Sequence, residues 1–271
     1  MSSPRSPARW RREPPPARRG ARRDTVVSAG VERLVRGYVD SARGARRLAE
    51  RSGFLRWLDG SLERPGALFV RSLFAVHDID DLGRLDLPWW TFAAIRRVDA
   101  FLAARGGTAT AFEYGPGAST LWLARRCRQV AAVEHDPAWW PMLSRRVAGL
   151  ANVDIRHVPG TPAPPGAPAP HRSAQPGWTH LDFSAYVAAI REAGGPFDLI
   201  VIDGRAREGC LREAQAHLKP DGLIVFDNPN RRRYREALRD CGLRIERHRG
   251  FAPTVPWPSE TALLTRTSGG G

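Results

Sequence analysis

Two acidic residues, Glu113 and Glu134, each follow a short apolar run and are the first candidates for chemistry. Glu113 opens the segment EYGPGAST, in which Gly115 and Gly117 let the backbone approach a ligand and the next residues start a helix whose free amides are donors. Glu134 ends the run VAAVE, where a carboxylate can accept hydrogen bonds from two ribose hydroxyls. Together they predict a nucleoside site at the ends of two neighbouring strands.

The acid at position 113 decides which nucleoside the site would take. A dinucleotide fingerprint would bring a pyrophosphate close to Glu113 and would have a third small residue where Thr120 stands. A carboxylate repels phosphate, whereas it attracts the sulfonium and ammonium groups of S-adenosylmethionine. The segment from Phe112 to Thr120 therefore predicts binding of S-adenosylmethionine.

A second set of oxygen donors follows two further apolar runs. FDLIVID ends at Asp203, and GLIVFDN ends at Asp227 and Asn228. Carboxylate and amide oxygens at neighbouring strand ends form a site for a hard cation and are compatible with Mg²⁺. In the alternative interpretation Asp203 orients substrate or cofactor directly, while Asp227 and Asn228 cap the next helix. The sequence leaves both interpretations open.

Short apolar runs alternate with helical segments along most of the chain. Runs such as TATAFEY, QVAAVEH and FDLIVID are each followed by residues with helical apolar spacing, and Thr91 is a candidate N-cap of a helix before the first run. This alternation predicts the α/β class with a doubly wound parallel sheet. Segments 159–177 and 251–258 are rich in proline and interrupt the alternation, so both are predicted loops.

The blocks FEYGPGAST, VEHD, FDLIVIDGR and GLIVFDN resemble those of class I S-adenosylmethionine-dependent methyltransferases, and the resemblance covers Leu87 to Leu264. It implies a Rossmann-like seven-stranded sheet of order 3-2-1-4-5-7-6 with the last strand antiparallel, and S-adenosyl-L-methionine as the methyl donor. The cofactor-binding residues that it implies lie at the ends of the first, second and fourth strands: Glu113, Tyr114, Gly115, Gly117, Ser119, Thr120, Glu134, His135, Asp136 and Asp203.

The set Asp203, Asp227 and Asn228 is similar to the metal ligands of catechol-type O-methyltransferases. There the ion binds the substrate hydroxyl oxygen and lowers its pKa. The resemblance implies catalytic roles for Asp203 and Asp227, with Mg²⁺ as a second cofactor. Because methyl transfer is an in-line displacement, the enzyme gains most by holding both reactants in line. We expect O-methylation of a small hydroxylated molecule.

Four residues are candidates for contact with this acceptor. Trp89 and Trp90 precede the first sheet-packing helix, Arg205 follows Asp203, and Trp257 lies in the second proline-rich loop. The alternative for the two adjacent tryptophans is packing in the core, and for Arg205 a solvated charge.

Two other functions remain open at this stage: an RNA (ribose 2′-O) methyltransferase, and a non-catalytic nucleoside-binding scaffold. Two kinds of nucleic-acid enzyme fit less well. IDGR stands where an adenine N-methyltransferase would have Asn/Asp-Pro-Pro-aromatic, and Cys210 lies several residues past the strand end, too far for the nucleophile of a cytosine C5 enzyme.

Composition divides the chain into four parts. Residues 1–24 carry eight arginines against two acids among many prolines, which predicts a disordered tail. Residues 25–86 have helical apolar spacing and are a predicted helical appendage. We expect the methyltransferase domain at 87–266 and a flexible C-terminus at 267–271.

The net charge of +14 could indicate a nucleic-acid partner. Nearly all the basic residues are arginine, however, alongside abundant Ala, Pro and Gly, which is typical of a genome-wide compositional bias. No apolar run reaches the length of a spanning helix. The three cysteines are widely spaced and suit neither a disulfide framework nor a zinc site. We expect a cytoplasmic protein with a small-molecule partner and no membrane association.

Overall fold

A seven-stranded sheet forms the centre of the computed structural model, which describes residues 41–267 apart from 42–43, 77, 165–170, 174 and 176. The order across the sheet is β3-β2-β1-β6-β7-β9-β8. Counting only these strands, it is the order 3-2-1-4-5-7-6, so the predicted fold class is confirmed. The strands are β1 (Thr110–Tyr114), β2 (Gln129–Glu134), β3 (Val153–His157), β6 (Phe197–Ile202), β7 (Leu218–Asp227), β8 (Arg244–Gly250) and β9 (Ser259–Thr265).

Strands β3, β2, β1, β6 and β7 pair in parallel, and β9 pairs antiparallel with β7 and β8. All residues of β6 are buried, as expected for a parallel strand covered on both faces, and this explains its unbroken apolar run. The carboxyl ends of β1, β2, β6 and β7 meet at one edge, which we call the carboxyl edge. The start of β9 also lies there, because Thr261 pairs with Asp227.

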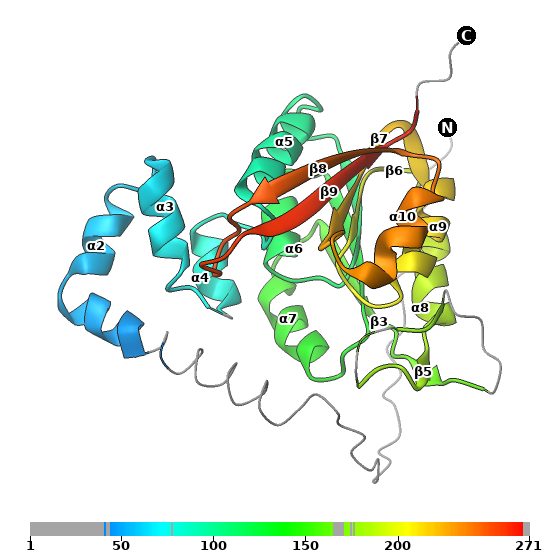
Figure 1. The fold of residues 1–271 in the computed structure, drawn as a ribbon, viewed down its shortest axis with the longest axis horizontal. Coiled ribbons are helices and arrows are strands. Elements are labelled where there is room, and N and C mark those ends of the chain that lie inside the picture. Colours follow the sequence, from blue (N-terminus) through cyan, green and yellow to red (C-terminus); the bar gives the residue numbers. More distant parts are fainter. Residues whose placement is uncertain are drawn as a thin grey trace, which may run out of the picture.

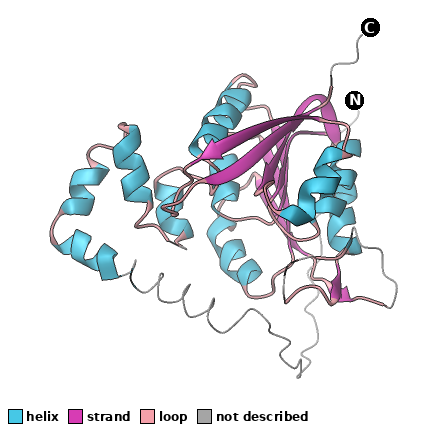
Figure 2. Ribbon diagram, in the orientation of Figure 1, coloured by secondary structure: helices cyan, strands magenta, loops and turns pink. Residues whose placement is uncertain are grey.

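Helices cover both faces of the sheet (Figures 1 and 2). One face carries α5 (Phe92–Ala103), α6 (Ala118–Ala124) and α7 (Trp139–Val147), and the other carries α8 (Ser184–Ala188), η2 (Ala189–Glu192), α9 (Arg207–Ala216), η3 (Arg232–Tyr234) and α10 (Arg235–Arg239). Thr91 is the N-cap of α5, as predicted, since its hydroxyl accepts a hydrogen bond from the amide of Ala94.

The helices before the sheet extend to one side of it (Figure 1). Residues 44–51 are helical, and α2 (Phe54–Asp59) and α3 (Pro65–Ser72) follow with a small separate core. In contrast, α4 (Ile79–Arg84) contacts α6, and its residues Ile79 and Leu82 belong to the main core. The core thus begins before residue 87, the expected start of the domain.

Several expectations fall on residues that are not described: the tail 1–24, residues 25–40 of the appendage, 268–271 at the C-terminus, and part of the loop 159–177. The described part of that loop includes β4 (Thr161–Pro162), which pairs with β5 (Leu181–Asp182). Within the described ranges, no helix combines the length and the apolar character needed to cross a membrane.

A buried ion pair ties α4 to α3. Both carboxylate oxygens of the fully buried Asp81 accept hydrogen bonds from Arg71, at 2.8 and 2.9 Å, and Arg46 and Arg84 also lie 3.0 Å away. Burial alone would raise the pKa of Asp81, but these arginines hold it below its ordinary value. The carboxylate is therefore ionised, and α3 and α4 depend on it.

We predict that Asp81→Asn lowers the free energy of unfolding by about 3 kcal/mol, because it leaves buried guanidinium donors without a charged partner. The neighbouring Asp80 offers a matched control: its carboxylate pairs with Arg146 but is mostly exposed, so Asp80→Asn should cost less than about 1 kcal/mol. Urea unfolding of both variants measures the difference. Equal costs for the two variants would contradict this account.

Candidate functional site at the carboxyl edge

The turn after β1 lies directly against the turn after β6. The backbone oxygen of Tyr114 accepts a hydrogen bond from the amide of Asp203 at 3.0 Å. Gly115 has a φ of +82°, and a Cβ there would lie 2.6 Å from the backbone of Gly204. Only glycine suits this position, on both conformational and steric grounds. The two turns therefore form one continuous backbone surface.

Glu113 is fully buried beneath this surface, where its carboxylate accepts hydrogen bonds from the hydroxyls of Ser119 and Thr120. The Thr120 hydroxyl in turn accepts from the amide of Gly117 at 2.9 Å. Burial raises the pKa of Glu113 to about 8, against the effect of the two hydroxyls and helped by the charges of Asp203 and Glu134.

These contacts alter the roles expected for three residues. Ser119 and Thr120 were predicted to bind cofactor, but both side chains are buried and hold Glu113. Tyr114 packs in the core, where its hydroxyl donates to the backbone oxygen of Val187 at 2.7 Å. Only the backbone of Tyr114 reaches the carboxyl edge. The side chain of Glu113 thus fixes the path of the turn through these two hydroxyls.

Glu134 ends β2, as predicted, with one carboxylate oxygen fixed by the backbone. Its Oε1 accepts hydrogen bonds from the amides of His135 at 2.7 Å and Asp136 at 2.6 Å. No described residue donates a hydrogen bond to Oε2. This arrangement fixes the carboxylate and leaves acceptor capacity for a pair of ligand hydroxyls. Asp136 itself accepts from the amides of Ala138 and Trp139, so its side chain caps α7.

His135 sits in an aromatic surround made by Trp178, Phe183 and Tyr186, with ring centroids 4.8 to 5.8 Å away. Its Nδ1 is 2.8 Å from Glu134 Oε1 without hydrogen-bond geometry, and its Nε2 has no partner among the described residues. The buried hydroxyl of Tyr186 is also without a described partner. Two buried polar groups thus remain for a ligand to satisfy.

The ends of β6 and β7 are joined by Arg207, which sequence reasoning missed. Its guanidinium donates to the backbone oxygens of Asp203, Gly204 and Asp227, and to Asp203 Oδ1 at 2.5 Å. Arg207 is 4% exposed. It follows Asp203 by four residues, and this spacing was the one sequence signal for the pair.

Asp227 is buried beside this ion pair, and its Oδ1 accepts from the hydroxyl of Thr261 at 3.2 Å. Burial, together with the charge of Asp203, raises the pKa of Asp227, while Arg207 opposes the shift. Asn228 has a φ of +51° and its amide bonds to the backbone oxygen of Glu260. The two carboxylates are therefore close neighbours in different environments.

The residues predicted to hold Mg²⁺ do not fit a divalent ion as they are arranged. The Arg207 guanidinium already supplies a positive charge on Asp203 and on the backbone oxygens around it. Among the described residues, no three His, Cys, Asp or Glu side chains form a metal-binding group. The metal prediction therefore lacks support, and we derive no step through a metal.

The four predicted acceptor residues do not lie together. Trp90 is fully buried in the core and packs edge-on against Trp122, so its ring does not reach the site. Trp89 instead covers the glycine turn, since a Cβ at Gly117 would lie 2.9 Å from its ring. Trp257 is 54% exposed in the loop before β9, at the carboxyl edge.

Arg205 turns toward the aromatic surround of His135. Its guanidinium carbon lies 5.1 Å from the centroid of the Trp178 ring, and its Nε has no hydrogen-bond partner among the described residues. Burial lowers the pKa of Arg205. A neighbouring aromatic that the sequence did not single out, Trp139, donates from Nε1 to the backbone oxygen of Pro116 at 2.9 Å.

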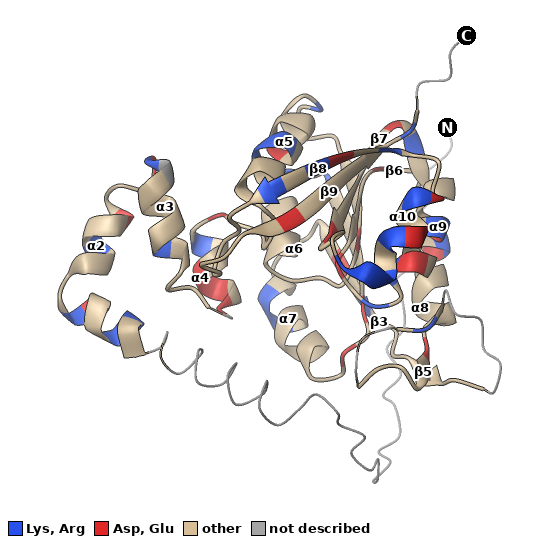
Figure 3. Cartoon of the chain, viewed as in Figure 1, with Lys and Arg blue, Asp and Glu red and all other residues tan. Residues whose placement is uncertain are grey.

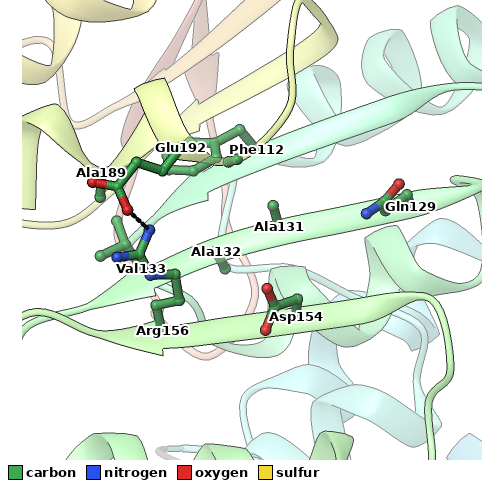
Figure 4. A pocket seen from close by; sticks show the side chains of 10 residues that line it. Phe112, Gln129, Ala131, Ala132, Val133, Asp154, Arg156, Ala189 and Glu192 are labelled. Carbon is green, nitrogen blue, oxygen red and sulfur yellow. Dashed lines mark ion pairs between the residues drawn. The ribbon is translucent and has the colours of Figure 1, made fainter. Parts of the chain in front are cut away.

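We compare two cavities that are lined by described residues. One of about 110 Å³ runs along β2 and β3, where Arg156 and Glu192 form an ion pair at 2.9 Å (Figure 4). It is too small for a nucleoside. The other, of about 340 Å³, lies at the start of α9 and has Arg207 in its wall. Only the second cavity adjoins the ends of β6 and β7.

No family model matches the chain, and no curated protein matches it. The fold is similar to solved structures described as precorrin 8w decarboxylase from Methanobacterium thermoautotrophicum (22% identity, 66% of this chain and 92% of that one, TM-score 0.43) and precorrin-6y C5,15-methyltransferase from Geobacter metallireducens (15%, 66% and 91%, 0.43). Another is 1,6-didemethyltoxoflavin-N1-methyltransferase from Burkholderia thailandensis (18%, 72% and 84%, 0.39). Because these likenesses are distant, the site is interpreted from its own residues.

The raised pKa of Glu113 predicts a pH dependence of stability. Folded Glu113 holds its proton up to about pH 8, whereas the unfolded residue releases it near its ordinary value of 4.5. The folded state thus binds more protons between these values, so stability should fall as pH rises from about 4.5 to about 8 and then level off. At about 1.4 kcal/mol per pKa unit, the loss is on the order of 5 kcal/mol.

Glu113→Gln removes the titrating proton and should flatten this part of the profile. Urea unfolding at intervals from pH 5 to pH 9 measures the free energy for both proteins. If the two profiles keep the same slope between pH 5 and pH 8, Glu113 does not titrate as described.

Proposed function

We propose that this protein is an S-adenosylmethionine-dependent methyltransferase that O-methylates a small hydroxylated molecule. The observation that carries the proposal is the pair of strand-end carboxylates: Glu134, held by two backbone amides with acceptor capacity to spare, and the buried Glu113 beneath the glycine turn. Two acids in these positions are complementary to a nucleoside that has ribose hydroxyls and a positively charged group.

The residues of the carboxyl edge fit this cofactor. Glu134 would accept hydrogen bonds from the ribose hydroxyls, and the backbone of Gly115 and Gly117 would pass under the methionine part. Glu113 is neutral near pH 7 in the free protein, and a cationic ligand above the turn would lower its pKa and favour its ionised form. When bound, S-adenosylmethionine supplies the methyl group on its sulfonium.

A pyrophosphate fits the same turn poorly. The Glu134 carboxylate would repel it, and the added negative charge of a phosphate would push the pKa of Glu113 still higher and hold that group in its neutral form.

The acceptor would be activated by the carboxylates of β6 and β7. Arg207 fixes Asp203 by an ion pair, which orients this carboxylate. Asp227 is buried and has a raised pKa, as suits a group that takes a proton from a hydroxyl near neutral pH. In this assignment Asp203 positions the acceptor and Asp227 receives its proton.

We predict that Glu134→Ala raises the Kd of S-adenosylmethionine and of its demethylated product 10- to 100-fold, at roughly 1.4 to 2.8 kcal/mol, because a charged acceptor of two hydrogen bonds is lost. Calorimetry on the full chain measures both ligands. Glu192→Ala, which removes a mostly exposed carboxylate from the ion pair with Arg156, is the control and should leave both Kd values unchanged. The cofactor assignment fails if the wild-type chain binds neither ligand.

The roles assigned to Asp203 and Asp227 lead to a separate prediction for turnover. The acceptor for this test is found by screening hydroxylated metabolites. Asp227→Asn should lower kcat by at least about 100-fold, while the Kd of the demethylated cofactor changes less than about threefold. Because Arg207 supplies the fixed cation, a chelator should leave turnover of the wild type unchanged. If chelation abolishes turnover and Mg²⁺ restores it, a metal ion is required at the ends of β6 and β7, and the assignment of Arg207 as the fixed cation is wrong.

A further inference from the structure

A cleft of about 340 Å³ opens beside the proposed reaction site, between the start of α9, η3 and the residues Arg172, Ser173 and Thr179. Its volume suits a small molecule. We call it the arginine cleft and define it by the side chains used below: Arg172, Ser173, Thr179, Arg207, Glu208 and Tyr234.

One wall of the arginine cleft is the first turn of α9, a helix of ten residues. Its N-cap residue, Ala206, has a left-handed φ of +47°, and no side chain caps the helix. Uncapped amides at a helix start carry partial positive charge and bind anions. This end of the helix is open to the cleft, since Ala206, Arg207 and Glu208 all line it.

Two guanidinium groups add to this positive end. Arg207 uses four of its hydrogen bonds on oxygens of the β6 and β7 ends, and one of its five N–H groups has no acceptor among the described residues. At the rim, the exposed Arg172 donates a single described side-chain hydrogen bond, to the backbone oxygen of Thr179. Both guanidinium groups retain donors for a ligand.

The surrounding elements carry charges of both signs, with arginines along η3 and the acids Glu208 and Glu236 on α9 and α10. Arg233 stacks on the Tyr234 ring at 5.1 Å, and Arg207 lies 5.7 Å from that ring's centroid on the cleft side. Figure 3 shows Lys and Arg gathered along η3 and the start of α10, next to α9. Of the described lining residues, Glu208 alone is acidic. Its negative charge disfavours binding of an anion, so removal of that charge should tighten anion binding.

We infer that the arginine cleft binds the methyl acceptor through an oxyanion, a carboxylate or a phosphate, so that the acceptor is a hydroxylated acid. The inference deepens the proposed function and rests on it, because only a methyltransferase has a methyl acceptor for the cleft to bind. Arg207 links the two parts: the same guanidinium lines the cleft and holds Asp203 and the Asp227 backbone. An oxyanion anchored beside it brings the rest of the molecule to the two carboxylates.

The test uses the full chain with inorganic phosphate and with acetate as probes, and chloride at equal ionic strength as the reference. Unfolding midpoints measured against probe concentration give an apparent Kd for each anion. Arg172→Gln should weaken binding about threefold or more, and Glu208→Gln should tighten it by a similar factor. Arg97→Gln, on α5 at the other face of the sheet, is the control and should change neither value.

If phosphate binds and acetate does not, the acceptor carries a phosphate. If acetate binds, with or without phosphate, a carboxylate on the acceptor is sufficient for binding in the cleft. The inference is overturned if neither anion binds more tightly than chloride, or if Arg172→Gln and Glu208→Gln do not shift the Kd in opposite directions. The demethylated cofactor is titrated on the same samples. If it binds and the anions do not, the cleft is misassigned and the proposed function stands; if the anions bind and it does not, the proposed function fails.

Discussion

The buried carboxylate of Glu113 is the interaction on which the carboxyl edge depends. It joins the end of β1 to the start of α6, since the hydroxyls of Ser119 and Thr120 both donate to it. This fixes the path of the glycine turn, and the turn fixes the contact between Gly115 and Gly204. The cost is a carboxyl group in a place that disfavours its charge, as its raised pKa shows. A cationic ligand above the turn would offset that cost.

Arg207 plays the corresponding part for the other half of the site. A buried guanidinium that bonds to Asp203, Gly204 and Asp227 holds the ends of two strands at fixed distance and compensates one of two close carboxylates. The second carboxylate, Asp227, then carries the raised pKa of a buried acid near a like charge. A fixed cation thus lies where the sequence suggested a metal ion.

The fold could be predicted from sequence because the parallel strands β1, β2, β6 and β7 each contain an apolar run and each is followed by a helix, as with FDLIVID and α9. Strand-end residues such as Glu134 could be placed for the same reason, since topology brings those ends together. Side-chain direction could not be predicted. Ser119 and Thr120 face inward to Glu113, and Trp90 packs in the core while its neighbour Trp89 covers the turn. Trp178 and Tyr186 come from a loop and a short helix, and no period in the sequence indicated their approach to His135.

The central claim is that the acids beneath the turn select a cationic nucleoside over a dinucleotide. The most direct measurement is calorimetric titration of S-adenosylmethionine and of NAD⁺ into the full chain at neutral pH under identical conditions. This account predicts saturable binding of S-adenosylmethionine and at least about 100-fold weaker binding of NAD⁺, since a cationic ligand favours ionisation of Glu113 whereas a pyrophosphate opposes it and also lies against the Glu134 carboxylate. Equal or tighter binding of NAD⁺ would contradict it.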